Sequence, residues 1–296
     1  MANPYPIIEV QPEWVVEPEG MGSKRKFWYR QTEESAAWLF KYPQPNTGQH
    51  WAEKVAAEIS EILGILHAKV ELAVFEGQQG SVTESFARGG RELVHGNQIL
   101  AVIVHGYDPK REFGQTSHTL PNIWQVMDRI FVAPEVARRA KCCLAEYLVL
   151  DALIGNTDRH HENWGILRKR TGERWTGFIA PSFDHASSLG RELLDVRRER
   201  LLAENRVAHY VERGRGAVYW SEDERHGPSP LELVRRAAGK YPDLFRQASR
   251  KLEGIDEADF RQIVERVPPG WITLSSQAFA LELLRYNFKQ LQELLL

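Results

Sequence analysis

An aspartate and an asparagine stand five positions apart in the segment Asn156 to Asn163, which follows an apolar helical run and precedes an apolar strand-like run. In phosphotransferases of the kinase type, a loop carboxylate accepts the proton of the acceptor hydroxyl, and an amide five positions later binds magnesium. The pattern therefore predicts that Asp158 is the catalytic carboxylate and that Asn163 is a metal ligand.

A second carboxylate, Asp184, follows the strand-like run Trp175 to Ile179. Phosphoryl transfer needs such a group on the metal ion, because the charge spread over the transferring phosphoryl group must be neutralised. Two short strands could bring Asn163 and Asp184 to one Mg2+ ion. A loop aspartate taken alone is more often a turn residue that caps backbone, so this prediction depends on the combined spacing with Asp158.

A lysine for the nucleotide phosphates is expected at Lys41, in the apolar strand-like run Ala37 to Tyr42. If it faces inward it needs a carboxylate partner, because an unpaired buried charge is costly. The helical run Gln49 to Leu63 offers Glu53 and Glu58, which lie about 140° apart around a helix, so at most one faces the strand. Glu53 is the preferred partner and Glu58 the alternative. If Lys41 instead extends to solvent, both glutamates belong to an exposed helix face.

Glycines upstream of this strand could bring backbone amides close to phosphate oxygens, with basic side chains beside them. A glycine turn followed by surface lysines is also common, and only its position before the Lys41 strand favours a phosphate loop. The predicted nucleotide contacts in this loop are Gly20, Gly22, Ser23, Lys24 and Lys26.

Hydrophobic periodicity predicts two lobes that position these groups. Aromatic and β-branched runs predict a small antiparallel sheet, crossed by the helix Gln49 to Leu63, with strands at residues 27–30, 37–42, 69–76 and 81–87. Helical periodicity over Glu135 to Ile154 and most of Pro230 to Leu296 predicts a mainly helical second lobe. Between them, Glu192 to Pro230 is dense in Arg and Glu and predicts a long, exposed and mobile connection.

The expected fold is therefore α+β and protein-kinase-like. Residues 1–86 form a small β-rich N-lobe with one crossing helix and the start of a hinge, and residues 87–296 form a larger, mainly helical C-lobe. The chain of 296 residues, 43% hydrophobic and 26% charged, suits two lobes of an ordinary globular protein.

Charge and cysteine content restrict the partners and the compartment. A formal charge of −2 gives no overall positive field for nucleic acid or an anionic membrane, so neither is expected as a partner. The two cysteines, Cys142 and Cys143, are adjacent and fit neither a disulfide framework nor a zinc site, which indicates a reducing cytoplasm. We expect no export signal and no membrane span.

The segment Leu153 to Leu167, taken with the residues above, resembles the catalytic loop of the HipA-like serine/threonine kinases. These bacterial toxin kinases are distantly similar to phosphoinositide kinases. The resemblance covers about Gly20 to Leu296, and it implies ATP as the phosphoryl donor, Mg2+ as the metal and a protein substrate, such as an aminoacyl-tRNA synthetase or another translation factor. It further implies that His160 lies near the nucleotide and that the adenine is held by a hinge of Glu84, Ser85 and Phe86.

The chain also departs from that family. Full-length members carry an additional amino-terminal subdomain that contacts an antitoxin, and the stretch before the predicted phosphate loop is too short for it. An antitoxin or other regulator is therefore expected to be a separate partner or to use another surface. The autophosphorylated serine of the family has no counterpart at Pro18-Glu19, and Ser23 is the substitute candidate.

Three other functions remain open at this point. A lipid or small-molecule kinase would also use the spacing of Asp158, His160 and Asn163, and a pseudokinase would bind nucleotide and act by docking to a partner. A metal hydrolase would combine His160 and His161 with the two aspartates, although neighbouring histidines project in different directions.

The arginines between Arg191 and Arg215 have two interpretations of their own. They form either a solvated surface or a site near the catalytic groups that recruits an acidic substrate.

Overall fold

A mixed sheet forms the N-lobe of the computed structural model, which describes residues 3–18 and 25–295. Its strands are β1 (Ile7–Val10), β2 (Val15–Pro18), β3 (Lys26–Tyr29), β4 (Trp38–Lys41), β5 (Val70–Phe75) and β6 (Gln78–Glu84), in the order β1-β5-β6-β4-β3-β2. A 3-10 turn, Pro12–Trp14, joins the first two. The four predicted strands pair antiparallel, as expected. Strand β1, which the sequence did not predict, pairs parallel with β5, so the whole sheet is mixed and not antiparallel throughout.

Alternation along β4 decides where the predicted lysine points. Phe40 is fully buried in an aromatic cluster on one face of the sheet, where its ring stacks 5.0 Å from that of Phe27. Successive side chains on a strand point to opposite faces, so Lys41 points to the other face. That face is covered by helix α1 (Gln49–Ile62), which packs on β5 and β6 and ends before Gly64 at φ +59°.

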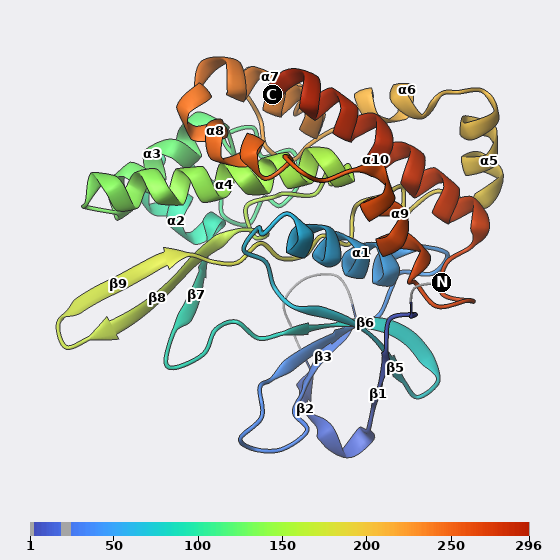
Figure 1. Cartoon of the computed structure of the whole chain (residues 1–296). Coiled ribbons are helices and arrows are strands. Elements are labelled where there is room, and N and C mark those ends of the chain that lie inside the picture. Colours follow the sequence, from blue (N-terminus) through green and yellow to red (C-terminus); the bar gives the residue numbers. More distant parts are fainter. Residues whose placement is uncertain (1–2, 19–24, 296) are drawn as a thin grey trace.

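A second, three-stranded antiparallel sheet begins the C-lobe. It contains β7 (Glu92–His95), β8 (Gly165–Thr171) and β9 (Arg174–Ile179), in that order. The hairpin of β8 and β9 extends away from the helices (Figure 1). The predicted lobe boundary between Phe86 and Ala87 falls in the link from β6 to β7.

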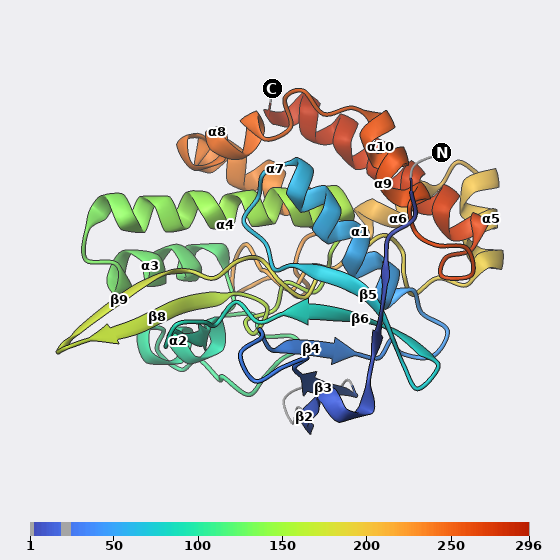
Figure 2. The same ribbon diagram turned by 60° about the horizontal axis from the view of Figure 1, so that its bottom comes forward.

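Helices make up the rest of the C-lobe. They are α2 (Gly96–Ile103), α3 (Leu120–Ile130), α4 (Pro134–Ile154), α5 (Asp195–Ala203), α6 (Val207–Glu212), α7 (Pro230–Lys240), α8 (Pro242–Arg250), α9 (Glu257–Glu265) and α10 (Leu274–Leu295). Helix α4 is central and packs against α3, α7, α8 and α10 (Figure 2). This is the α+β, two-lobed arrangement that the sequence predicts. Among the described residues, no helix is both long and apolar enough to cross a membrane.

The segment Glu192 to Pro230 differs from its prediction. It contains α5 and α6, and α10 packs against both of these helices. Leu201, Val207 and Val211 are buried in the main core, so the expectation of an exposed, mobile connection is wrong. The many charged residues obscure these few apolar positions, which are sufficient to attach two short helices.

Candidate active site

A cleft of about 980 Å3 is lined by residues from both lobes. Of the predicted site residues that the structure describes, all but one line it, and the exception, Glu53, is buried behind the cleft wall. The lining residues are Lys26, Lys41, Glu84, Ser85, Phe86, Asp158, His160, Asn163 and Asp184. The fold therefore brings groups from distant parts of the chain to one cavity.

Lys41 connects the two lobes through ion pairs. Its Nζ lies 2.9 Å from Glu53 Oε1 on α1 and 3.3 Å from Asp184 Oδ1 in the C-lobe. Ser81, opposite Lys41 on β6, donates a hydrogen bond of 2.8 Å to Glu53 Oε2. The carboxylate of Glu53 is thus held on both oxygens, and it directs the ammonium group of Lys41 into the cleft.

The charge of Lys41 is secured by these partners. Burial alone would lower the pKa of its ammonium group, but the carboxylates of Asp184 and Glu53 raise that pKa above its ordinary value. The alternative partner, Glu58, instead lies 2.7 Å from Lys54 Nζ, which also pairs with Glu71. Glu53 and Glu58 therefore pair with different lysines.

The end of α4 positions the loop that carries Asp158. Gly155 ends the helix at φ +66°, a left-handed conformation that suits glycine at a helix C-terminus. Asn156 then donates from Nδ2 to Asp151 Oδ1 (2.7 Å) and accepts the backbone N–H of Asp158 (3.1 Å). This local network fixes the start of the loop against the last turn of the helix.

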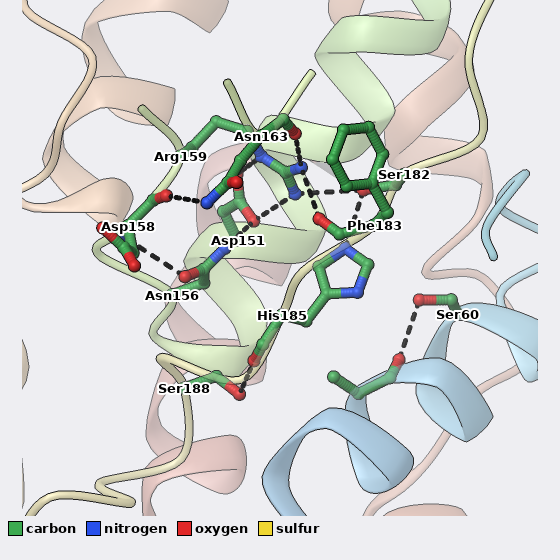
Figure 3. Close-up of polar contacts among 11 residues, drawn as sticks. Ser60, Asp151, Asn156, Asp158, Arg159, Asn163, Ser182, Phe183, His185 and Ser188 are labelled. Carbon is green, nitrogen blue, oxygen red and sulfur yellow. Dashed lines mark hydrogen bonds and ion pairs between the residues drawn. The ribbon is translucent and has the colours of Figure 1, made fainter. Parts of the chain in front are cut away.

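Arg159 joins the two segments that carry the predicted metal ligands (Figure 3). Its guanidinium donates to both carboxylate oxygens of Asp151, each at 2.7 Å. The same group donates to the backbone oxygen of Asn163 at 2.8 Å, to that of Phe183 at 3.4 Å and to Ser182 Oγ at 3.0 Å. One buried side chain therefore holds the loop after α4 beside the loop after β9.

The amide of Asn163 and the carboxylate of Asp184 are suited to a hard cation such as Mg2+, which prefers oxygen ligands. Asn163 Nδ2 donates to the backbone oxygen of Asp158 at 2.7 Å, which directs the amide oxygen the opposite way. Asp184 has φ +57°, a conformation that aspartate tolerates better than most residues. His185, hydrogen-bonded to Ser182 Oγ at 2.7 Å, anchors the backbone beside it.

Ser187 orients the carboxylate of Asp158. Its hydroxyl donates to Asp158 Oδ2 at 3.1 Å and accepts a bond of 3.0 Å from Arg191 Nη2. Asp158 itself is partly exposed to the cleft. An acceptor hydroxyl can therefore reach a carboxylate whose position is already restricted.

Sequence reasoning missed Arg159, Asp151 and Ser187. Arg159 and Asp151 could have been predicted as a pair, because one lies in the last turn of a helix and the other in the loop that follows, and a buried arginine needs a carboxylate. No local signal distinguishes Ser187 from any other serine of a loop.

The two adjacent histidines have separate environments. His160 lines the cleft, where its Nδ1 accepts the backbone N–H of Glu162 at 3.3 Å and its Nε2 lies 3.6 Å from Glu112 Oε1. His161 is buried and bonds to Tyr107 Oη at 2.7 Å, and burial lowers its pKa to about 4. Within the described ranges, no group of three or more His, Cys, Asp or Glu side chains is placed to hold a metal ion.

The predicted hinge begins at Glu84, the last residue of β6. The backbone N–H of Ser85 donates to the oxygen of Ala37 at 2.8 Å, so that group is already used within the N-lobe. The ring of Phe86 packs 5.4 Å from that of Phe183, which precedes Asp184. Adenine would therefore have to bond to other backbone groups of the hinge, with these rings beside it.

The predicted phosphate loop is only partly described. Gly20, Gly22, Ser23 and Lys24 lie outside the described residues, and their predicted roles are untested. Lys26 begins β3, opposite Lys41, and lines the same cleft.

Known proteins similar to this chain share its fold and its family. The family of HipA-like C-terminal domains matches residues 16–267. The serine/threonine-protein kinase CtkA of Helicobacter pylori is 26% identical over 168 residues, which is 54% of this chain and 49% of that protein. The chain thus spans about half the length of this relative in the sequence match.

Solved structures extend the likeness over nearly the whole chain. The crystal structure of the proinflammatory kinase CtkA of Helicobacter pylori matches with a TM-score of 0.80 and 18% identity, over 97% of this chain and 98% of that one. HipA of Shewanella oneidensis, in a complex with HipB and operator DNA, matches with a TM-score of 0.59 and 13% identity, over 96% of this chain and 66% of that one. These matches confirm the kinase-like fold, and with the family match they show that this chain belongs to the HipA-like C-terminal domain family.

Proposed function

We propose that the protein is an ATP-dependent serine/threonine protein kinase of the HipA-like type. The observation that carries this proposal is the position of Lys41, which pairs with Glu53 and Asp184 at the cleft that Asp158 and Asn163 also line. A lysine held by a helix carboxylate, opposite a catalytic aspartate and two oxygen ligands for magnesium, is the set of groups that phosphoryl transfer requires.

The proposed reaction moves the γ-phosphoryl group of ATP to a protein hydroxyl. Asp158 orients that hydroxyl for in-line attack and accepts its proton, while Lys41 binds the phosphates of the nucleotide. Magnesium held by Asn163 and Asp184 would neutralise charge on the phosphates. His160 lies at the nucleotide side of the cleft, and the hinge from Glu84 to Phe86 holds the adenine.

The proposed partners follow from the family. The acceptor is a protein, for which an aminoacyl-tRNA synthetase or another translation factor is the first class to test. Because the HipA structure from Shewanella oneidensis is in a complex with HipB, a separate antitoxin-type regulator and a toxin role are proposed for this chain as well. A cytoplasmic location is proposed on the same grounds and on the cysteine content.

Radiolabelled ATP tests the proposed function directly. The protein is incubated with magnesium, labelled ATP and either cell extract or mixed lipids, beside the variant Asp158→Asn and the control Asp128→Asn, whose exposed side chain lies on α3. We expect labelled protein with the wild type and with Asp128→Asn, and none with Asp158→Asn. The affinity of Asp158→Asn for ATP should be retained. Labelled lipid without labelled protein would favour a lipid kinase, and magnesium-dependent ATP binding without any transfer would favour a pseudokinase.

A further inference from the structure

Arginines line the part of the cleft that lies beyond the catalytic aspartate. They come from the end of the loop after Asp184, from α5, from the turn between α5 and α6, and from the connection that follows α6. We call them the arginine wall: Arg191, Arg197, Arg206, Arg213 and Arg215. In this stretch of the lining the only carboxylate is Glu192, among the residues that the structure describes.

Among the residues that the structure describes, most of these arginines have no carboxylate partner. Glu192 accepts a hydrogen bond from Tyr210, and Arg206 reaches only Glu204, at 3.4 Å. Across residues 3–18 and 25–295, no carboxylate lies within ion-pair distance of Arg197, Arg213 or Arg215. These three side chains are exposed at the cleft, so their guanidinium groups are accessible to a ligand.

Hydrogen bonds hold the arginine wall close to Asp158. Arg191 donates to Ser187, which in turn donates to Asp158. On the other side, the backbone N–H of Ala217 donates to the oxygen of Thr157 at 3.1 Å, which fixes the connection that carries Arg213 and Arg215 beside the catalytic loop. A substrate hydroxyl at Asp158 would therefore have its neighbouring residues against these arginines.

We propose that the arginine wall binds an acidic segment of the protein substrate that flanks the accepting serine or threonine. This inference rests on the proposed kinase function and deepens it by naming the substrate class. Guanidinium groups bind carboxylates through paired hydrogen bonds. When such pairs form inside a cleft, they fix the position of the bound peptide along it. An acidic flank would thus both attract the substrate and set which hydroxyl reaches Asp158.

An acidic peptide fits this surface better than nucleic acid does. The same elements carry Glu199, Glu204 and Glu212 outside the cleft, where they would repel a phosphate backbone that extended past it. The formal charge of −2 over the whole chain also gives no overall positive field that would hold nucleic acid. The arginines of this stretch that have no carboxylate partner among the described residues lie in the cleft lining, which matches a short run of carboxylates.

Peptide binding in the absence of ATP tests the proposal without relying on catalysis. The probe is a fluorescein-labelled peptide of alternating Glu and Ala around one Ser, and its affinity is measured by anisotropy. The cleft variant combines Arg197→Gln, Arg213→Gln and Arg215→Gln, and its folding is checked by circular dichroism. The matched control combines Arg246→Gln, Arg250→Gln and Arg261→Gln, which removes the same charge from exposed positions on α8 and α9.

We expect the cleft variant to bind the acidic peptide about tenfold to a hundredfold more weakly than the wild type, and the control to bind within about twofold of it. Added salt should weaken wild-type binding. Equal binding of a peptide with Gln in place of Glu, or unchanged affinity of the cleft variant, would overturn the proposal. Tighter binding of single-stranded RNA of equal length would overturn it in favour of nucleic acid. If the peptide bound through these arginines but no phosphoryl transfer occurred, the proposed kinase function would be contradicted, whereas the proposed binding of acidic segments by the arginine wall would stand.

Discussion

Arg159 and Asp151 form a bidentate ion pair, with both N···O distances at 2.7 Å and both side chains only 3% exposed. The pair ties the loop that carries Asp158 to the last turn of α4. Because the same guanidinium also bonds the backbone oxygens of Asn163 and Phe183, it sets the spacing of the two segments that would bind magnesium. One buried side chain thus sets the geometry of the predicted metal ligands.

Replacing Arg159 by Lys should disturb both the fold and the site. Lysine keeps the charge but cannot make the parallel pair of hydrogen bonds, so we expect the free energy of unfolding to fall by about 2 kcal/mol or more. Urea denaturation measures this. Arg168→Lys is the control, because its pair with Glu92 is exposed and should contribute less than about 1 kcal/mol. Equal losses in the two variants would contradict the role given to Arg159.

Substitutions of Glu53 and Glu58, both on α1, should differ in their effect on activity. Glu53→Gln removes the charge that holds Lys41, and we expect it to lower kcat/KM for ATP by about a hundredfold. Glu58→Gln leaves Lys41 untouched and loosens Lys54 instead, so it should change activity by less than about threefold. Steady-state kinetics on the two variants checks this. Similar losses in both would contradict the pairing as a functional one.

Local sequence patterns were sufficient to predict those features that depend on hydrophobic periodicity or on the spacing of residues within one segment. The sequence identified Lys41 as a candidate and left open whether it faces inward, and the structure places it in the cleft. The spacing of Asp158 and Asn163 in one loop predicted a shared site, and both residues line that same cleft. The helix Gln49 to Leu63 was predicted within one residue of α1. Choosing between Glu53 and Glu58 needed the rotation of the helix, which depends on packing and on Lys54 taking the other carboxylate.

Features that depend on distant partners were not predictable in this way. Strand β1 pairs with β5 more than sixty positions later in the sequence, and no pattern in its four residues signals a parallel partner. Helices α5 and α6 are attached by Leu201, Val207 and Val211, which are too few to give a clear period among charged neighbours. The contact of Ser187 with Asp158 arises only when the loop after Asp184 folds back.

Ser187→Ala should affect the chemical step more than nucleotide binding. Without its hydroxyl, the carboxylate of Asp158 loses a hydrogen bond that restricts its orientation, and we expect kcat to fall about tenfold. The dissociation constant for ATP, measured by calorimetry, should change by less than about twofold, because Ser187 does not contact the predicted nucleotide ligands. Ser187→Thr keeps the hydroxyl and should recover part of the rate. An unchanged kcat in Ser187→Ala would remove the positioning role.

The buried His118 should make the fold sensitive to acid. Its Nε2 accepts a hydrogen bond of 3.0 Å from Trp164 Nε1, and its Nδ1 donates to the oxygen of Ala217 at 2.8 Å, so the ring is neutral. Burial lowers its pKa to about 3, whereas in the unfolded chain the pKa of histidine is about 6.5. Below about pH 6.5 the unfolded state therefore binds a proton that the folded state does not, and stability falls as the pH falls. Between pH 7 and pH 5 this one group should cost about 2 kcal/mol.

Urea denaturation at a series of pH values measures this effect. The variant His118→Gln cannot take up the proton, so its free energy of unfolding should depend less steeply on pH over that range, whatever its stability at pH 7. The control His105→Gln removes an exposed histidine and should keep the wild-type dependence. If His118→Gln and the wild type lost stability in parallel between pH 7 and pH 5, the buried neutral state of this ring could not be the cause.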